Sequence, residues 1–189
     1  CINLIKLLGI KKILINSFYL KDQINEFVKN HNFDIEIKVI EDGNCILNTG
    51  GGILNLISKS DEEDFLIFNP DTIWNKDYVS EINHMIDLYF NKRFKNTLLL
   101  VNKHLSFDKN LKGDFGLDNN LIINNQKNFI FTGCQILNKS IFKNKIISNF
   151  SISKIWLDLI KDSQLSGCES KLIFYHVTNL EIFKRLKDL

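Results

Sequence analysis

The sequence contains no alanine, one proline, one methionine and only two arginines, Arg93 and Arg185. Because arginine is so scarce, few bidentate clamps for phosphate are available, and lysine must supply positive charge as a point charge. The net charge of +2 is nearly neutral. It lacks the basic excess that nucleic-acid binding requires. We therefore expect no nucleic acid as a partner.

Cysteine is also rare, and its spacing excludes two kinds of site. Cys1, Cys45, Cys134 and Cys168 form no CxxC pair, and no histidine lies at zinc-finger spacing from them. We expect free thiols and a cytoplasmic protein. The sequence has no apolar run long enough to cross a membrane and no secretory signal. We therefore expect no membrane partner.

The overall composition is that of one globular domain. It has 189 residues, of which 44% are hydrophobic and 24% charged. We therefore predict a single domain over residues 1–189. The chain opens at Cys1 without a methionine, and residues 1–8 resemble the end of a helix stopped by Gly9. We expect a further segment upstream, so that this domain is incomplete at its N-terminus.

Strand and helix patterns alternate along the chain. Buried strands are predicted at 10–16, 35–40, 64–69 and 97–102, and helices at 20–31, 53–58 and 77–91. The second half predicts short strands at 113–117, 121–123 and 129–137, a helix at 151–161, a strand at 172–176 and a helix at 178–187. Thr178 and Glu181 fit a capping box for the last helix. This order predicts an α/β domain with a mostly parallel sheet flanked by helices.

Two segments at predicted strand ends could bind a ligand, because ligands of open α/β sheets bind at the carboxyl ends of the strands. The first is a loop with Thr49, Gly50, Gly51 and Gly52 before a helix, where backbone N–H groups and the helix dipole favour an anion. A flexible glycine-rich turn is the alternative. The loop is neither a GxGxxG nor a Walker A motif.

The second segment carries Asp71, which follows the predicted strand 64–69 after Asn69 and Pro70. A carboxylate at a strand end is a natural ligand for Mg²⁺ bound to substrate phosphates. An aspartate after proline is also a common turn residue, so an Asx turn is the alternative.

Taken together, these motifs resemble the sugar-1-phosphate nucleotidyltransferases, in particular N-acetylmuramate-1-phosphate uridylyltransferase and mannose-1-phosphate guanylyltransferase-like proteins. The resemblance covers essentially the whole chain. It rests on motifs in a fixed order: Gly9–Asn16, Tyr19-Leu20-Lys21-Asp22-Gln23-Ile24, Leu47–Gly52, Asn69-Pro70-Asp71 with Trp74, Gly113-Asp114-Phe115, Phe131-Thr132-Gly133, Trp156–Ile160, and His176-Val177 with Glu181.

The resemblance implies a Rossmann-like mixed sheet and transfer of a nucleoside monophosphate from UTP or GTP to a sugar 1-phosphate, with Mg²⁺ as cofactor. Asp71 would be the catalytic metal ligand, with His176 at the position of a second ligand. Imidazole is a poor ligand for Mg²⁺, so a strand-end histidine without a ligand role is the alternative for His176. Thr49, Gly50, Gly51, Gly52 and Asn69 would bind the nucleotide. Gly113, Asp114, Thr132 and Gly133 would face the sugar phosphate.

The family's Gly-x-Gly-Thr-Arg loop, which follows the first strand and cradles the triphosphate, does not occur in this sequence. The resemblance therefore predicts a sheet lacking its first strand and this loop. Pro70 stands where the family usually has glycine, and Thr178-Asn179-Leu180 replaces Gly-Thr-Pro.

Two hypotheses remain open. The chain is an enzyme whose front end comes from an upstream or separately encoded N-terminal segment, or it is an inactive remnant that binds a nucleotide-sugar or a partner. A glycosyltransferase of similar fold is a weaker third reading, because Asn69-Pro70-Asp71 replaces Asp-x-Asp.

Overall fold

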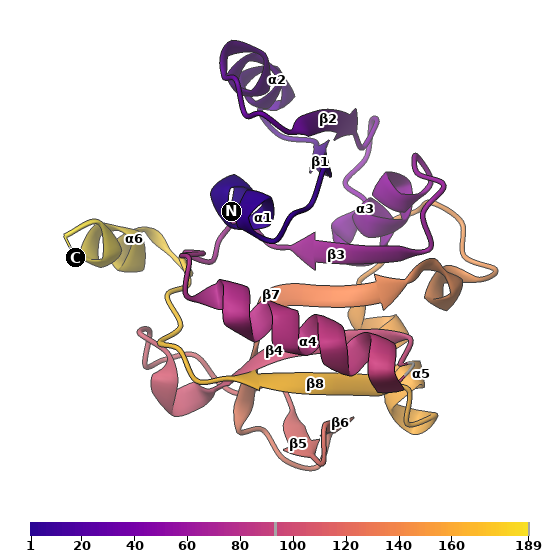
Figure 1. Ribbon diagram of the computed structural model, residues 1–189, viewed down its shortest axis with the longest axis vertical. Helices are drawn as coiled ribbons and strands as arrows, with labels where there is room; N and C mark the ends of the chain where they lie inside the picture. Colours follow the sequence, from indigo (N-terminus) through magenta and orange to yellow (C-terminus); the bar gives the residue numbers. More distant parts are fainter. Residues whose placement is uncertain (93, 189) are drawn as a thin grey trace.

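The computed structural model describes residues 1–92 and 94–188, and its strands lie between helices (Figure 1). The first half contains α1 (Ile2–Leu7), β1 (Lys12–Ser17), α2 (Lys21–Asn30), β2 (Glu36–Glu41), α3 (Asn48–Ile57), β3 (Asp64–Phe68), α4 (Tyr78–Lys92) and β4 (Asn96–Asn102). The second half contains β5 (Gly116–Asp118), β6 (Leu121–Ile123), β7 (Phe129–Asn138), α5 (Ser153–Lys161), β8 (Leu165–Ser170) and α6 (Leu180–Lys187), with 3₁₀ helices at Lys103–Leu105 and Lys139–Phe142.

The strands form two hydrogen-bonded groups, a sheet in the order β1-β2 and a sheet in the order β3-β7-β4-β8-β6-β5. β1 pairs in parallel with β2, and β4 pairs in parallel with β8. β7 lies between β3 and β4 and is antiparallel to both, so β3, β4 and β8 run in the same direction. The expected α/β fold, a mixed sheet whose strands mostly share one direction, is confirmed.

Each face of the larger sheet packs against its own helices. On one face, α3 and α5 bury Ile53, Ile57 and Trp156 against Leu98 and Leu100 of β4. On the other face, α1 and α4 pack with Leu99 in a second cluster that includes Leu4, Trp74, Tyr78, Ile82 and Met85. Neighbouring residues of β4 thus enter opposite cores, as the pleat of a strand buried on both sides requires.

The last predicted strand, at 172–176, is wrong. The strand is β8, and the residues after it form only single bridges, Ser106 with Phe174 and Thr72 with His176. β8 has the polar sequence Leu-Ser-Gly-Cys-Glu-Ser, which carries no apolar pattern. It is nevertheless buried between β4 and β6, and the Ser166 hydroxyl is satisfied there by the Thr97 hydroxyl at 2.6 Å. A search for apolar runs in the sequence therefore misses a strand whose polar side chains have hydrogen-bond partners inside the core.

Two helix starts also differ from the prediction. α3 begins at Asn48, five residues before the predicted start at 53, so Gly50, Gly51 and Gly52 form its first turns. The cap of α6 is Asn179, whose side chain accepts the N–H of Ile182, and Thr178 is not the cap. Short polar residues cap equally well at neighbouring positions, so tertiary contacts decide which one does.

The helix end predicted at Gly9 is confirmed. Gly9 follows α1 with a φ of +77°, which suits a glycine after a helix. Cys1, Cys45, Cys134 and Cys168 are free. Burial raises the pKa of the Cys168 thiol to about 11, so this thiol is protonated at neutral pH. Among the described residues, no helix has both the length and the apolar character needed to cross a membrane.

Candidate functional site

The segment after β3 is held in place by the strand beside it. The Asn69 N–H donates to the Gly133 carbonyl of β7 at 2.8 Å, and the indole N–H of Trp74 donates to the Asn69 carbonyl at 2.9 Å. Gly133 has a φ of +90°, and a Cβ there would lie 2.8 Å from Cβ of Asn69. Glycine is therefore required at 133 both by its backbone conformation and by the close approach of Asn69.

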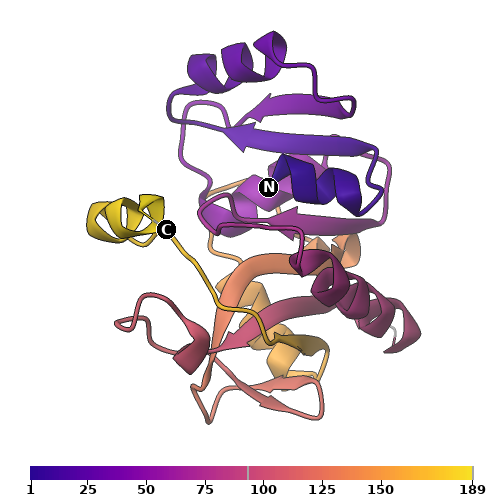
Figure 2. The same ribbon diagram turned by 60° about the vertical axis from the view of Figure 1, so that its left-hand side comes forward.

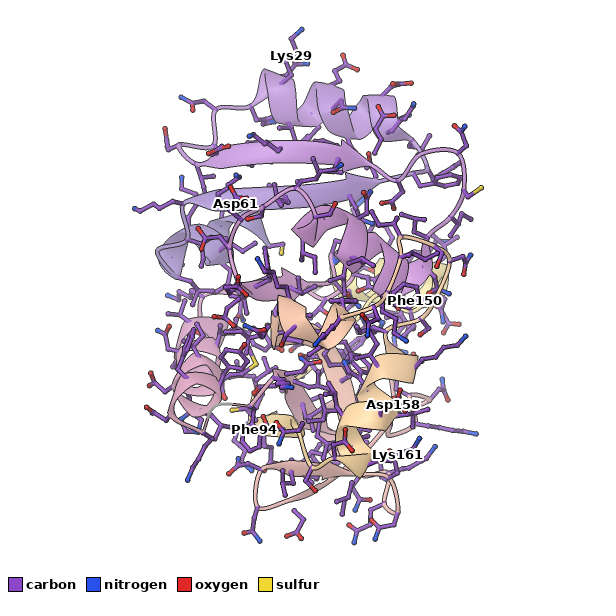
Figure 3. The ribbon with its side chains drawn as sticks, turned by 90° about the vertical axis from the view of Figure 1, so that its right-hand side faces the viewer. Lys29, Asp61, Phe94, Phe150, Asp158 and Lys161 are labelled. Carbon is purple, nitrogen blue, oxygen red and sulfur yellow. The ribbon has the colours of Figure 1, made fainter. Side chains whose placement is uncertain are left out.

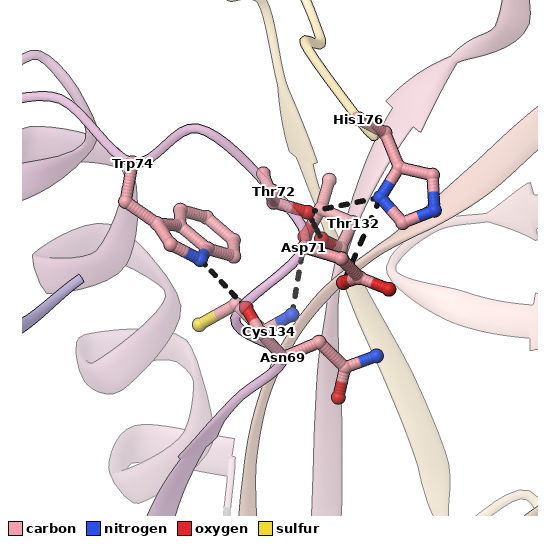
Figure 4. Close-up of polar contacts among 7 residues, drawn as sticks. All are labelled: Asn69, Asp71, Thr72, Trp74, Thr132, Cys134 and His176. Atoms are coloured by element: carbon pink, nitrogen blue, oxygen red, sulfur yellow. Dashed lines mark hydrogen bonds and ion pairs between the residues drawn. The ribbon is translucent and has the colours of Figure 1, made fainter. Parts of the chain in front are cut away.

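Asp71 and His176 come together at this edge of the sheet, although 104 residues separate His176 from the neighbouring Thr72. Nδ1 of His176 lies 3.7 Å from Oδ1 of Asp71 and 3.5 Å from the Thr72 hydroxyl (Figure 4). The Thr72 hydroxyl donates to the Thr132 carbonyl at 2.7 Å, and the Val177 N–H donates to the Asp71 carbonyl at 2.8 Å. These contacts tie the segment after β3 to β7 and to the segment after β8.

The Asp71 carboxylate is the accessible group of this cluster. Its side chain is 48% exposed, whereas that of His176 is 23% exposed. The His176 ring is stacked on Phe174 at 5.4 Å between centroids. In the part of the chain that the structure describes, no hydrogen bond reaches the Asp71 carboxylate, and no three His, Cys, Asp or Glu side chains gather into a metal site. A cation here would take one carboxylate from the protein and its other oxygens from substrate and water, as Mg²⁺ does with phosphates.

The predicted nucleotide-binding glycines lie against the chain's own backbone. The N–H groups of Gly50 and Gly51 both donate to the Phe150 carbonyl, at 2.9 and 3.2 Å. A Cβ on Gly51 would lie 1.9 Å from the Ser148 carbonyl oxygen, and the Thr49 hydroxyl accepts the Ile152 N–H at 3.1 Å. The glycines thus let residues 148–152 pack across the start of α3, and their role toward a nucleotide stays a prediction.

This packing predicts unequal effects for two neighbouring alanine substitutions. Gly51→Ala places a methyl group against a backbone carbonyl that cannot move freely, so we expect the free energy of unfolding to fall by about 3 kcal/mol. The methyl group of Gly52→Ala meets the flexible Asn16 side chain at 3.0 Å and lies 3.9 Å from the Asp42 carboxylate, which is ordinary contact. The substitution also gains helix propensity, so we expect a change within about 1 kcal/mol. Urea unfolding of both variants tests this. Equal losses would mean that residues 148–152 do not press on Gly51.

The four predicted sugar-phosphate residues lie along the start of β7. Thr132 is buried, its hydroxyl donates to the Leu99 carbonyl at 2.9 Å, and it is next to Gly133 beside Asn69. Gly113 and Asp114 are on the segment that pairs with Phe129, and Oδ2 of Asp114 accepts the Phe131 N–H at 2.9 Å. Burial raises the pKa of Asp114, and that hydrogen bond partly offsets the rise. The structure thus places Thr132 and Gly133 with Asn69, and Gly113 and Asp114 at the beginning of β7.

Comparison with known proteins supplies the deciding observation about the fold. No protein-family model and no curated protein matches the sequence. Solved structures do match. UDP-glucose pyrophosphorylase complexed with UDP-glucose superposes with a TM-score of 0.76 at 13% identity, over 99% of this chain and 83% of that one. The inositol-1-phosphate CTP transferase from T. maritima gives 0.74 at 12%, over 98% and 81%. HddC from Yersinia pseudotuberculosis, complexed with GMP-PN, gives 0.71 at 19%, over 97% and 80%.

The chain has the fold of the CTP transferase and the UDP-glucose pyrophosphorylase. Because ligands of open α/β sheets bind beyond the carboxyl ends of the strands, this fold directs attention to the edge where Asp71 and His176 meet.

Sequence reasoning missed a polar cluster at the same kind of edge, at the ends of β1 and β2. Asp42 accepts from the Asn16 amide at 3.0 Å and from the Asn55 amide at 3.1 Å. Asn16 and Asp42 also surround the position where a Gly52 Cβ would lie. Polar residues ending two predicted strands were the available signal. In this chain the cluster borders the first half of α3, and it is a further candidate for contact with a polar ligand.

The segment that carries His176 is anchored by a buried carboxylate, which predicts a pH-dependent stability. Asp108 is 5% exposed and accepts the Thr178 hydroxyl at 2.7 Å and the Asn110 N–H at 3.0 Å. The Thr178 hydrogen bond, followed by the Asn110 bonds, lowers the pKa of Asp108. An acid whose pKa is depressed on folding stabilises the fold above its unfolded pKa and loses that contribution as pH falls through its folded pKa.

We therefore expect Thr178→Val to lower the free energy of unfolding by about 1–2 kcal/mol at pH 7, because it removes a hydrogen bond to a charged group. The difference from the parent should shrink as pH falls below about 4, the unfolded pKa of aspartate. Thr178→Ser keeps the hydroxyl and is the control. Denaturant unfolding at several pH values measures both, and a loss independent of pH would show that the ionised Asp108 is not the partner that matters.

Proposed function

We propose that this chain, acting with a front segment that supplies the triphosphate loop, transfers a nucleoside monophosphate from UTP or GTP to a sugar 1-phosphate and releases pyrophosphate. One observation carries the proposal. An accessible aspartate, Asp71, lies at the carboxyl end of β3 in a fold shared with a CTP transferase and a UDP-glucose pyrophosphorylase. The motifs that resemble sugar-1-phosphate nucleotidyltransferases support it independently.

The Asp71 carboxylate suits a magnesium ion better than the His176 imidazole does. Asp71 offers hard oxygen atoms with no competing hydrogen bond among the described residues, which suits Mg²⁺. His176 offers a nitrogen, which Mg²⁺ accepts poorly. We therefore assign the cation to Asp71, and we assign to His176 the role of holding the carboxylate. When bound, Mg²⁺ would neutralise charge on the nucleotide phosphates.

In the reaction, an oxygen of the sugar phosphate attacks the α-phosphorus of the nucleoside triphosphate. A bond forms between them, the bond from the α-phosphorus to the bridging oxygen breaks, and pyrophosphate leaves with that oxygen. Such transfers depend on positioning and charge neutralisation and need no covalent intermediate on the protein. In this proposal Thr49, Gly52 and Asn69 line the nucleotide, and Asp114 and Gly133 lie toward the sugar phosphate.

The test is release of pyrophosphate by the purified chain with Mg²⁺, each nucleoside triphosphate and a set of sugar 1-phosphates. We expect none from the chain alone, because two arginines and no Gly-x-Gly-Thr-Arg loop leave the triphosphate charge unbalanced. We expect release when a synthetic segment carrying an apolar strand and that loop is added. No release with the segment present, but saturable binding of UDP-glucose, would support the alternative of an inactive nucleotide-sugar-binding protein.

A further inference from the structure

Two stretches of the sequence carry lysines and no acidic residue. Residues 119–157 contain no aspartate or glutamate, and neither do residues 43–60, whose one charged side chain is Lys59. The charged side chains of the longer stretch are all lysines: Lys127, Lys139, Lys143, Lys145 and Lys154. Although the net charge of the whole chain is only +2, its charges are thus distributed unevenly. Such asymmetry indicates a surface that attracts anions.

The fold places these two stretches side by side. The Asn149 amide donates to the Ile46 carbonyl at 2.8 Å, and the Phe150 N–H donates to the Leu47 carbonyl at 3.1 Å. In Figure 2, α1 and α4 lie in front of the strands, and α3 and α5 lie behind them. Figure 3 shows Phe150 between α3 and α5. The connection from β7 to α5 therefore runs along the face that α3 and α5 cover.

The loop in this connection exposes isoleucine side chains. Every residue from Lys143 to Asn149 is exposed. Ile146 is 78% exposed and Ile147 is 46% exposed, and Ile46 on the adjoining segment is 60% exposed. Single exposed apolar side chains are common, but a group of them on adjoining segments marks an interaction site. We call these three residues the isoleucine patch.

The loop is fixed at both ends, so the isoleucine patch is a feature of the folded chain. Phe142 is buried, and its ring packs against that of Phe150 with 6.4 Å between centroids. The Lys145 N–H donates to the Phe142 carbonyl at 2.9 Å, and the Phe150 carbonyl accepts the N–H groups of Gly50 and Gly51. These contacts tie the loop to the core on one side and to α3 on the other.

The lysines beside the patch are available to an anionic partner. Lys143, Lys145 and Lys154 are exposed, and none of them forms an ion pair within residues 1–92 and 94–188. The first acidic residue after the longer stretch is Asp158, and it pairs with Lys161 at 3.2 Å.

The acidic side chains at the other borders of this face offset the lysines little. Glu63 pairs with Lys139 at 2.8 Å, and Asp42 accepts hydrogen bonds from two side-chain amides. Asp61, beyond the end of α3, lies on the opposite side of the view from Phe150 in Figure 3. The positive charge beside the isoleucine patch is therefore not neutralised by the chain itself.

We propose that this face binds the surface of a bilayer that contains anionic lipids. The isoleucine patch enters the boundary between headgroups and acyl chains, and Lys143, Lys145 and Lys154 lie against the lipid phosphates. Apolar burial and electrostatic attraction act together in such peripheral binding. The sequence criteria for spanning segments and secretory signals do not detect a surface loop, so this proposal takes the place of the expectation of no membrane partner.

The form of the loop favours a bilayer over a protein or a nucleic acid. Residues 143–149 contain no helix or strand and expose their side chains, whereas peptide recognition uses a groove or an open strand edge. The loop also has no aromatic residue or arginine that could stack on a base. Exposed isoleucines beside lysines match the apolar boundary and the charged headgroups of an anionic bilayer.

Co-sedimentation of the full chain with vesicles tests the proposal. We expect vesicles of phosphatidylcholine and phosphatidylglycerol in equal amounts to bind the chain at least about 10-fold more tightly than phosphatidylcholine alone. Binding should weaken as NaCl rises from about 0.1 M to about 1 M, because the Debye length shortens from about 10 Å to about 3 Å. Equal binding to both kinds of vesicle, or binding to neither, would overturn the proposal.

Lysine variants locate the contact. Replacing Lys143, Lys145 and Lys154 together by glutamine should weaken binding to the anionic vesicles at least about 20-fold, because each lysine near such a surface contributes a several-fold factor. The control gives the same net charge by changing three exposed lysines of other segments to glutamine: Lys29, Lys76 and Lys187. It should weaken binding less than about 3-fold. Equal losses in the two variants would show a response to net charge alone and would contradict the proposed face.

A fluorophore that responds to solvent polarity shows which face meets the lipid. Cys45 is exposed next to Ile46, whereas Cys134 and Cys168 are buried, so Cys1→Ser leaves Cys45 as the exposed thiol to label. We expect its emission to shift to the blue on anionic vesicles. A label on Cys1 in the Cys45→Ser variant should not shift. A shift at Cys1 alone would mean that another face binds, contrary to the proposal.

The same samples distinguish other occupants of this face. A Cys45 label that shifts without vesicles, as the concentration of the chain rises, would assign the face to a second copy. Saturable binding of polyglutamate without binding to vesicles would assign it to an acidic protein. Either result contradicts the proposal. Turnover does not enter these measurements, so their outcome leaves the proposed transferase reaction to its own test.

Discussion

Asp71→Asn should abolish most of the pyrophosphate release obtained with the front segment, with a fall of about 10²–10³-fold in kcat/KM. The substitution keeps the shape of the side chain and removes its charge. Loss of one preorganised group that balances charge in a transition state has a cost of this size. The Asp71 carboxylate is half exposed and makes no hydrogen bond within the described residues, so the fold should be unaffected.

Two further variants make this result specific. Asp158→Asn removes an exposed aspartate on α5 whose partner is Lys161, and it should leave turnover unchanged. His176→Asn keeps a polar side chain next to Asp71 and should lower turnover by less than Asp71→Asn, because His176 positions the carboxylate. Steady-state kinetics at several Mg²⁺ concentrations measure all three. Full activity of Asp71→Asn would remove the observation on which the proposed function rests.

Asn96→Leu should be among the most destabilising single substitutions in the chain. Asn96 is fully buried. Its amide donates to Gln135 at 3.1 Å and to the Ile136 carbonyl at 2.9 Å, and its oxygen accepts the Trp156 indole N–H at 2.9 Å. Leucine would leave several buried polar groups with weaker partners or none, which costs about 1–3 kcal/mol for each group. We expect the free energy of unfolding to fall by about 3–4 kcal/mol.

Urea unfolding tests this prediction, with Asn125→Leu as the control. Asn125 is exposed in the turn after β6, so the same change of side chain there should cost less than about 0.5 kcal/mol. Trp156→Phe removes the indole donor and part of the buried ring but leaves the Asn96 and Gln135 side chains to bond each other, so it should give a smaller loss than Asn96→Leu. If Asn96→Leu were no more costly than the control, the network would contribute nothing beyond the apolar packing around it.

The polar core network also shows where sequence reasoning reaches its limit. Neither Asn96 nor Gln135 could be predicted as a core residue, because asparagine and glutamine are mostly exposed. Their burial depends on three partners from β4, β7 and α5 meeting at one point. β8 escaped prediction for the same reason, since Ser166 and Ser170 are buried although its sequence is polar.

Local sequence patterns were enough to predict the α/β class and the positions of β1, β2, β3, β4, β6 and β7, and they made Asp71 a candidate ligand. Local periodicity and apolar runs carry that information because it depends on residues close in the chain. Only the folded chain shows that Gly51 faces Ser148, that His176 lies 3.7 Å from Asp71, and that β1 and β3 each have a free edge among the described strands. These features join residues far apart in the chain, and their geometry follows from strand order, on which local sequence patterns carry no information.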